Sequence, residues 1–256
     1  MKKITKKTFL KKIKEHSDFS DCDLSGFSVA NAKIDGIGFY KCKMCDFSDC
    51  TFDWVTFDTC DFNEDYLTRC TFENCDFQDS DLHNVSIDNS TFKECDFMYA
   101  RITSAWINES KFDKSSFCEA VLTDADFSNC KFIDVKYDES TSNFALNCPE
   151  KGAFTAFKKA ELYDGQRVIV ELKVPAKAKR SSATSRKCRV SEAKVVAITS
   201  LDGKVSYKCN AYAMRTKFFV YTIGKTVKVA NFETNRWDEC APGIHCFITR
   251  QEAVNY

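Results

Sequence analysis

The chain has 256 residues, with 37 basic and 37 acidic side chains and a calculated isoelectric point near 6.8. It contains 15 cysteines, and an odd number without an evident signal peptide argues against a secreted disulfide framework. We therefore expect a cytoplasmic protein. No stretch is apolar over the ~20 residues that a membrane helix needs, so no membrane partner is expected.

Residues 1–16 carry seven lysines and one glutamate. Ile4, Phe9, Leu10 and Ile13 recur at helical spacing among these lysines. We predict a helical cap over residues 1–16 that covers the apolar end of the domain that follows. A basic arm for nucleic acid or for a membrane surface is the alternative.

A five-residue repeat fills the next part of the chain. Every fifth residue from Phe47 to Tyr137 is large and apolar, and an earlier block from Phe19 to Met44 keeps the same period. The step from Met44 to Phe47 is three residues, which indicates a two-residue deletion that bulges or offsets one corner. A period of five fits neither a helix nor a flat strand, so the chain must turn every five residues and form a solenoid.

Individual repeats such as Cys75–Asp79 and Ala125–Asn129 place a small residue two positions before the apolar centre. This pattern resembles the pentapeptide-repeat family over about residues 17–139. The resemblance implies a mainly β structure, a right-handed quadrilateral β-helix with four pentapeptides per coil, which we assign to residues 17–147. Dimerisation through a solenoid end is also known in this family, so an oligomer is an open alternative.

With four repeats per coil, side chains one coil apart should stack at about the 4.8 Å spacing of paired strands. Two columns are then almost entirely phenylalanine: Phe52, Phe72, Phe92, Phe112 and Phe132, and Phe57, Phe77, Phe97 and Phe117, which Tyr137 continues. Nine cysteines fall on the small inward position and should behave as small hydrophobes. Because Cys42 and Cys45 already have places in the repeat, we infer no metal or cofactor from their C-x-x-C spacing. Asp65 is the one inward carboxylate, and we expect a local loop there or a bond to backbone amides.

Residues 17–147 carry ten basic and twenty-six acidic side chains. When the repeats are sorted onto four faces, the first and the third are the most acidic. We predict that the third face binds a protein through Asp58, Asp76, Asp79, Asp96 and Glu119. Some pentapeptide-repeat proteins imitate duplex DNA, so the resemblance implies a basic partner such as a DNA-binding or defence protein. The plain alternative is that aspartate keeps a repeat soluble.

Four aromatic residues fall at outward positions of the repeat. They are Trp54, Tyr66, Tyr99 and Trp106. Exposed aromatic side chains on a polar surface are typical anchors of protein interfaces. We include them in the predicted protein-binding set, with docking of the C-terminal domain as the alternative.

Residues 148–256 carry twenty basic and ten acidic side chains and should form a basic, mostly β domain. The expected strands are 154–157, 168–174, 194–198, 217–221, 226–229 and 244–248. Thr249 and Glu252 form a capping box that should begin a short helix. The segment also resembles an uncharacterised domain that follows pentapeptide repeats in phage and gut-bacterial proteins.

A cluster of cations and hydroxyls lies between Lys177 and Arg189. Cations and hydroxyls of this kind hold phosphate by charge-assisted hydrogen bonds. We predict a phosphate-bearing ligand at Lys179, Arg180, Arg186, Lys187 and Arg189. A solvated loop, or a loop docked on the acidic repeat, is the alternative.

The segment from Glu239 to His245 is the remaining candidate site. A glycine–apolar–aromatic strand before a helix is faintly similar to the core of ADP-ribosyltransferase-type folds. The alternative function is therefore a nucleotide-binding or ADP-ribosyltransferase-like enzyme in residues 148–256, with His245 and Glu239 at its site and the β-helix as scaffold. His245 is otherwise a structural histidine.

These features together predict a non-enzymatic binding protein with an acidic β-helical platform and a basic second domain. In a phage, such a protein would inhibit a host enzyme or defence pathway. A purely structural, self-assembling rod is the third hypothesis.

Overall fold

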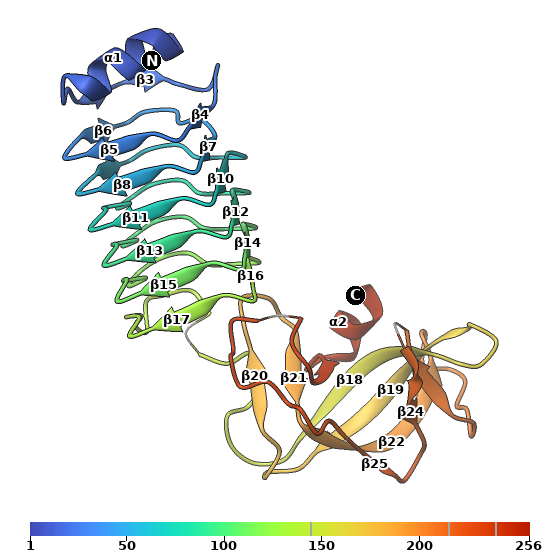
Figure 1. The fold of residues 1–256 in the computed structure, drawn as a ribbon. Coiled ribbons are helices and arrows are strands. Elements are labelled where there is room, and N and C mark those ends of the chain that lie inside the picture. The colour runs from blue at the N-terminus through green and yellow to red at the C-terminus, as the bar shows by residue number, and fades with distance from the viewer. Residues whose placement is uncertain (144, 215, 239) are drawn as a thin grey trace. The chain divides into compact units, whose positions relative to one another are not determined.

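The computed structural model describes residues 1–143, 145–214, 216–238 and 240–256. The chain divides into two compact units, Met1–Ala145 and Leu146–Tyr256. The first unit is a coil of short parallel strands, and the second is built on antiparallel sheets (Figure 1). The division lies two residues before the predicted one.

A helix caps the first coil. β1 (Lys2–Lys3) pairs with β3 (Cys22–Asp23), and α1 (Lys6–Lys14) follows at once. The hydroxyl of Thr5 accepts the N–H of Thr8 at 3.2 Å, which satisfies one free amide of the first turn. Phe9 is fully buried, with its ring 5.3 Å from that of Phe19. The predicted helical cap is therefore confirmed, and β1 is an addition to it.

Four faces follow one another around each coil, as the repeat predicts. Face 1 is a parallel sheet of β4 (Val29–Ala30), β7 (Phe47–Ser48), β10 (Tyr66–Thr68), β12 (Ser86–Asp88), β14 (Trp106–Asn108) and β16 (Asp126–Ser128). Face 2 contains β5 (Lys33–Asp35), β8 (Thr51–Asp53), β11 (Thr71–Glu73), β13 (Thr91–Lys93), β15 (Lys111–Asp113) and β17 (Lys131–Ile133).

Faces 3 and 4 have shorter strands. Face 3 begins with β2 (Phe19–Ser20), β6 (Gly38–Tyr40) and β9 (Thr56–Asp58) and continues as single bridges through Asp76, Asp96 and Ser116 to Lys136. Face 4 consists of single bridges from Asp23 through Lys43, Asp61, Asp81 and Arg101 to Val121. Since faces 1 to 4 repeat in this order, faces 1 and 3 lie on opposite sides of the coil.

The two-residue deletion shortens one coil without a bulge in its strands. Leu67 pairs with Ile87, a full coil of four pentapeptides later. Val29 pairs with Phe47 and Ile34 with Phe52, so the sequence separation of these partners is shorter than a full coil by the two deleted residues. Most corners contain a residue with positive φ, such as Asp49 at 54°. The corner between Met44 and Phe47 has none, so the deletion removes the left-handed residue of that corner.

The predicted phenylalanine columns form the core. The ring of Phe72 lies 4.6 Å from that of Phe52 and 4.7 Å from that of Phe92, with interplanar angles of 5° and 2°. Phe77 stacks in the same way at 4.8 Å from Phe57 and from Phe97. Neighbouring columns meet edge to face, so each ring contributes both stacked and perpendicular contacts.

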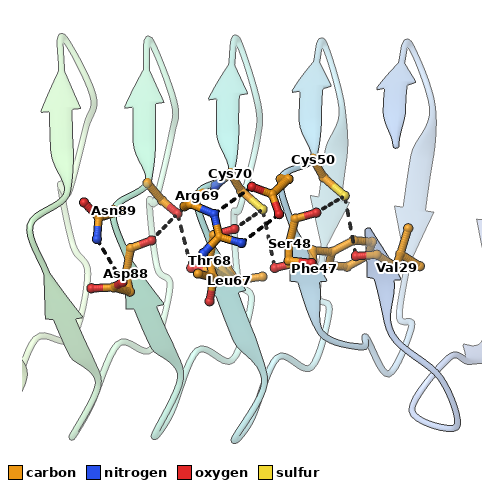
Figure 2. A network of polar contacts seen from close by, with 12 residues as sticks. Val29, Phe47, Ser48, Cys50, Leu67, Thr68, Arg69, Cys70, Asp88 and Asn89 are labelled. Carbon is orange, nitrogen blue, oxygen red and sulfur yellow. Dashed lines mark hydrogen bonds and ion pairs between the residues drawn. The ribbon is translucent and has the colours of Figure 1, made fainter. Parts of the chain in front are cut away.

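The small inward residues also make hydrogen bonds, which the prediction of small hydrophobes missed. Figure 2 shows the thiols of Cys50 and Cys70 beside backbone carbonyls; the Cys70 sulfur lies 3.5 Å from the carbonyl oxygens of Thr68 and Phe47. Ser90 occupies the next place in that column, donates to carbonyl oxygens and accepts the N–H of Cys70 at 3.0 Å. These bonds are additional to those of the backbone, because the carbonyls of Thr68 and Asp88 also accept the N–H groups of Asp49 and Arg69. All fifteen cysteines are free thiols.

Asp65 interrupts neither strand nor coil. Its N–H donates to the carbonyl of Phe62 at 3.0 Å, and its carbonyl accepts the N–H of Ser86 at 2.9 Å, so the expected local loop is wrong. Burial, with the nearby carboxylates of Asp46 and Asp61, raises the pKa of Asp65 to about 7.

The second unit has two antiparallel sheets. The larger sheet has the order β24 (Thr216–Tyr221), β23 (Ala211–Ala213), β18 (Phe154–Glu161), β19 (Arg167–Val174), β22 (Glu192–Ser200) and β25 (Thr226–Lys228). The smaller sheet contains β20 (Arg180–Ser182), β21 (Cys188–Val190) and β26 (Ile244–Cys246). The sequence did not predict β20, β21 or β23.

The final helix α2 (Arg250–Asn255) begins at the predicted capping box of Thr249 and Glu252. Among the residues that the structure describes, no helix is both long and apolar enough to cross a membrane.

Candidate functional site

Charged side chains on three of the four faces pair with residues one coil away. On face 1, Arg69 contacts Asp49 at 2.7 Å, and on face 4, Arg101 contacts Asp81 at 2.9 Å. On face 2, cross-coil pairs are Lys114 with Glu94 and Lys93 with Glu73. Within the described residues, face 2 therefore holds three ion pairs, whereas faces 1 and 4 hold one cross-coil pair each.

Face 3 differs. Between Lys41 and Lys136 its outward positions hold neither lysine nor arginine. Five carboxylates of this stretch, which we call the carboxylate face, are Asp58, Asp76, Asp79, Asp96 and Glu119. Within the described part of the chain, none of the five forms an ion pair. The structure thus brings all five predicted acidic residues to one face and leaves their charge uncompensated.

Two of the five carboxylates also support the backbone. Asp76 accepts the N–H of Gln78 at 2.9 Å, and Asp96 accepts the N–H of Met98 at 3.0 Å. Such bonds hold the chain as it leaves each bridge of face 3. We infer that Asp76 and Asp96 have a structural role in addition to their charge.

The other three carboxylates have only side-chain partners. Asp58 accepts the hydroxyl of Thr59 at 2.7 Å. Glu119 accepts the hydroxyl of Tyr99 at 3.0 Å, and Asp79 lies 3.4 Å from the amide nitrogen of Gln78. Their replacement leaves the backbone bonds of the coil intact.

The carboxylates of this face affect the pKa of Asp76, which lies in the middle of the row. Burial raises the pKa of Asp76, its bond to the N–H of Gln78 opposes this, and the charges of Asp96, Asp58 and Asp79 raise it further. Five carboxylates over four coils, at ~4.8 Å per coil, amount to roughly one charge per 4 Å. A single DNA strand carries one phosphate per about 3.4 Å of axis. The two linear charge densities are therefore similar.

The predicted aromatic anchors are exposed, but they do not gather. Tyr66 and Trp106 are 58% and 64% exposed and lie in one row of face 1, with Ser86 between them. Trp54, 67% exposed, occupies the corner after β8. Tyr99, 46% exposed, is the member that lies with the carboxylates. The nine-residue protein-binding set therefore divides between opposite sides of the coil.

The basic segment of the second unit is not a solvated loop. Residues 180–190 form the hairpin of β20 and β21, and Ser181, Ser182 and Thr184 are buried in it. The guanidinium of Arg180 donates to five backbone carbonyls, among them those of Pro149 at 2.7 Å and Ala176 at 3.0 Å. Its donors are used by the fold, which corrects the prediction that Arg180 faces a phosphate.

Arg189 is only 2% exposed. Its guanidinium donates to the carbonyls of Asn235 at 2.7 Å, Glu233 at 3.1 Å and Pro242 at 3.3 Å. Arg189 therefore fixes the loop before β26 and is not an open phosphate ligand.

The other three predicted cations have different surroundings. Arg186 contacts Glu252 at 2.8 Å and Asn147 at 3.1 Å. Lys179 is exposed, and Lys187 is half-buried. The five predicted phosphate ligands therefore do not form a single site.

His245 lies on β26 and its Nε2 is 3.0 Å from the carbonyl of Ala241. A carbonyl only accepts, so this nitrogen carries the proton. Burial is the main reason that the pKa of His245 falls to about 4, so the imidazole is neutral at pH 7. Glu239, its predicted partner, lies outside the described residues.

His245 and Lys187 line the same cavity, together with two lysines that the sequence analysis did not select, Lys158 and Lys159. The available signal was a pair of lysines directly after the expected strand 154–157. A charged pair at the end of a partly buried strand is a reason to expect a polar cavity.

Comparison with protein families agrees with this division of the chain. Residues 45–84 match a family described as pentapeptide repeats (8 copies), and residues 65–142 match a pentapeptide repeat region. Residues 144–253 match a family of unknown function (DUF5758). Pentapeptide repeats are thus followed by a domain to which no function is assigned. A search of curated proteins found no match.

Several solved structures resemble the chain. QnrB1, a plasmid-mediated fluoroquinolone resistance protein, is 14% identical, with a TM-score of 0.31 and coverage of 48% of this chain and 81% of QnrB1. HetL from Nostoc sp. strain PCC 7120, involved in heterocyst differentiation regulation, is 12% identical, with a TM-score of 0.30 and coverage of 50% of this chain and 63% of HetL. Rfr23 from Cyanothece 51142 is 13% identical, with a TM-score of 0.23 and coverage of 54% and 98%. At these values the likeness concerns the fold alone.

Proposed function

We propose that the protein is a binding protein and that its carboxylate face engages a basic partner, such as a DNA-binding or host-defence protein, by imitating the charge of a nucleic-acid strand. The observation that supports this is the absence of cations from face 3 between Lys41 and Lys136. Five carboxylates stand there without an ion pair in the described part of the chain, whereas face 2 holds three ion pairs and faces 1 and 4 one cross-coil pair each.

The physical reason is the energy of a fixed row of like charges. The carboxylates are held on a rigid coil, so they cannot move apart, and their mutual repulsion is relieved when a cation approaches. A basic cleft shaped for a phosphate backbone supplies such cations in a row. The interaction should weaken as the salt concentration rises, because screening reduces it.

Competition with DNA tests this function. The full-length protein, immobilised, is exposed to nuclease-treated bacterial lysate and then washed with a duplex oligonucleotide. We expect DNA-binding proteins to be retained and then released by the duplex. The variant Asp58→Lys, Asp79→Lys, Glu119→Lys should retain none of them, since it reverses three charges and leaves the backbone bonds of Asp76 and Asp96 intact.

The matched control reverses three exposed carboxylates elsewhere on the coil, as Glu64→Lys, Glu109→Lys, Asp124→Lys. This variant has the same net charge as the first and should retain the same proteins as the wild type. Equal loss with both variants would show a general effect of net charge. Retention that the duplex cannot displace would rule out imitation of DNA.

A further inference from the structure

A cavity of about 840 Å³ lies inside the second unit. Its wall is made by β18, β24, β25, the segment before β26 and the ring of Tyr256. A volume of this size is typical of sites for small ligands. The residues concerned are far apart in the sequence and belong to one compact unit.

The cavity opens along an unpaired stretch of β18. This strand pairs with β19 over its whole length, but on the other side it meets Phe247 at Phe157 and Tyr212 at Glu161. Lys159 lies between these two points, and in the described structure its one strand partner is Ile169 of β19. The N–H and C=O of Phe157 bond to Phe247, so those of Lys159, two residues on, face the same side. Among the described residues, the strand therefore leaves the backbone N–H and C=O of Lys159 without a strand partner on the side of the cavity.

The charge of the wall is positive. It contains Lys158, Lys159, Lys187 and Lys228, and none of the described lining residues is acidic. Lys228 is held by Glu192 at 3.2 Å, and the ammonium of Lys158 donates to the carbonyl of His245 at 3.1 Å. Two of the four cations, Lys158 and Lys228, are thus already engaged with groups of the protein.

The state of His245 agrees with a cationic cavity. After burial, the lysines at 187 and 158 are among the causes that lower its pKa, and its bond to Ala241 opposes them. Because the imidazole is neutral, the positive charge of the wall comes from lysine at any pH near neutrality.

The remaining wall contains aromatic side chains. Phe219 and Tyr221 of β24 line it, with their rings 5.4 Å apart, and so does Tyr256, whose ring lies 5.1 Å from that of Phe247. Burial raises the pKa of Tyr221, so its hydroxyl stays protonated. Aromatic side chains beside cations suit a ligand that combines a planar ring with an anionic group.

Arg189 supports the part of the wall that contains Pro242 and Gly243. It holds the carbonyls of Glu233, Asn235 and Pro242, and Pro242 and Gly243 line the cavity. A Cβ on Gly243 would lie 3.2 Å from the Cβ of Arg189, so the loop passes as close as glycine allows. The cavity therefore has a well-supported wall.

We propose that this cavity binds a nucleoside phosphate, with the phosphate at Lys159 and Lys187 and the base between the aromatic side chains. The open N–H and C=O of Lys159 would hydrogen-bond the ligand. This proposal rests on the second unit alone and is independent of the partner of the β-helix.

Calorimetry of the full-length protein with ATP, adenosine and inorganic phosphate tests it. We expect ATP to bind, and adenosine or phosphate alone to bind at least about ten-fold more weakly, because each makes only part of the contacts. The double variant Lys159→Gln, Lys187→Gln should weaken ATP binding by at least about ten-fold. Lys159→Arg keeps the cation and should bind ATP more tightly than Lys159→Gln.

The matched control is Lys173→Gln, Lys194→Gln, which removes two exposed lysines of the same sheet outside the cavity. Its affinity should equal that of the wild type. The fluorescence of Trp237 reports whether each variant is folded. The proposal is overturned if ATP gives no heat at millimolar concentration, if both double variants bind equally, or if inorganic phosphate binds as tightly as ATP.

Discussion

The two units of this protein use arginine in opposite ways. In the β-helix, Arg69 and Arg101 are exposed and pair with carboxylates of the preceding coil. In the second unit, Arg180, Arg189 and Arg250 donate to backbone carbonyls of loops. The arginines of the β-helix form ion pairs on the surface, whereas those of the second unit hold loops in place.

The reason lies in the backbone. A coil of the β-helix satisfies its peptide groups with the next coil, at the corners as well as in the strands, and the small inward side chains add further hydrogen bonds. The second unit has long connections without a repeating partner, and their carbonyls must find other donors. A guanidinium offers five, so one buried arginine can hold a whole loop.

The largest effect should come from the regular core. Phe72→Ala removes a ring stacked on two neighbours and should destabilise the β-helix by about 3–5 kcal/mol. Denaturant unfolding followed by far-UV circular dichroism measures this, while the fluorescence change of the buried Trp237 reports on the second unit. Phe132→Ala, at a half-buried end of the same column, is the control and should cost less. Equal costs would mean that the stack does not share its energy between coils.

Arg189→Met should destabilise the second unit by about 3 kcal/mol, since three carbonyls lose a charged donor. Unfolding followed at Trp237 measures the change. Arg189→Lys keeps the charge but not the fork of donors, so it should not restore stability. If Arg189→Met unfolds like the wild type, the contrast between the two units fails.

Asp65 breaks the rule that the inward positions are small and neutral, and it gives the β-helix a pH dependence. Its pKa is about 7 when folded and about 3.9 when unfolded, so the folded chain holds the proton more tightly. The free energy of unfolding should therefore fall as the pH rises from about 4 to about 7. Asp65→Asn should remove this slope and stabilise the β-helix at pH 8 by about 1–3 kcal/mol, since one pKa unit corresponds to about 1.4 kcal/mol.

Asp124→Asn is the matched control for Asp65→Asn, because it removes an exposed carboxylate of the same β-helix. Urea unfolding at pH 4, 6 and 8 compares the two variants. A slope that survives Asp65→Asn would place the proton uptake at another residue.

The smallest effect should come from the surface pairs. Arg69→Ala removes an exposed ion pair with Asp49, and its effect on the melting temperature should lie within experimental error. Differential scanning calorimetry at low and high salt measures it. A clear loss at low salt that disappears at high salt would show that cross-coil pairs stabilise the β-helix after all.

The sequence by itself determined that the first unit is a solenoid, because a period of five requires a turn every five residues. The resemblance to pentapeptide-repeat proteins supplied the four repeats per coil, which place Phe72 between Phe52 and Phe92. The helical cap and the capping box at Thr249 were also local signals. What the period did not reveal was hydrogen bonding by the inward cysteines and serines, because a thiol and a methyl group fill similar space.

The tertiary structure decided the second unit. Its sheet order places β18 beside β19 and β23, and its cavity collects residues from 158 to 256, which no local pattern relates. The hairpin of β20 and β21 was missed because its buried residues are serine, threonine and arginine, which a hydrophobic pattern assigns to a loop. In a solenoid, each coil repeats the one before it, so the neighbours of a residue can be predicted from its position in the repeat. In an irregular fold, the neighbours of a residue are decided only when distant segments meet. The same holds for the hydrogen-bond partners of each lysine and arginine.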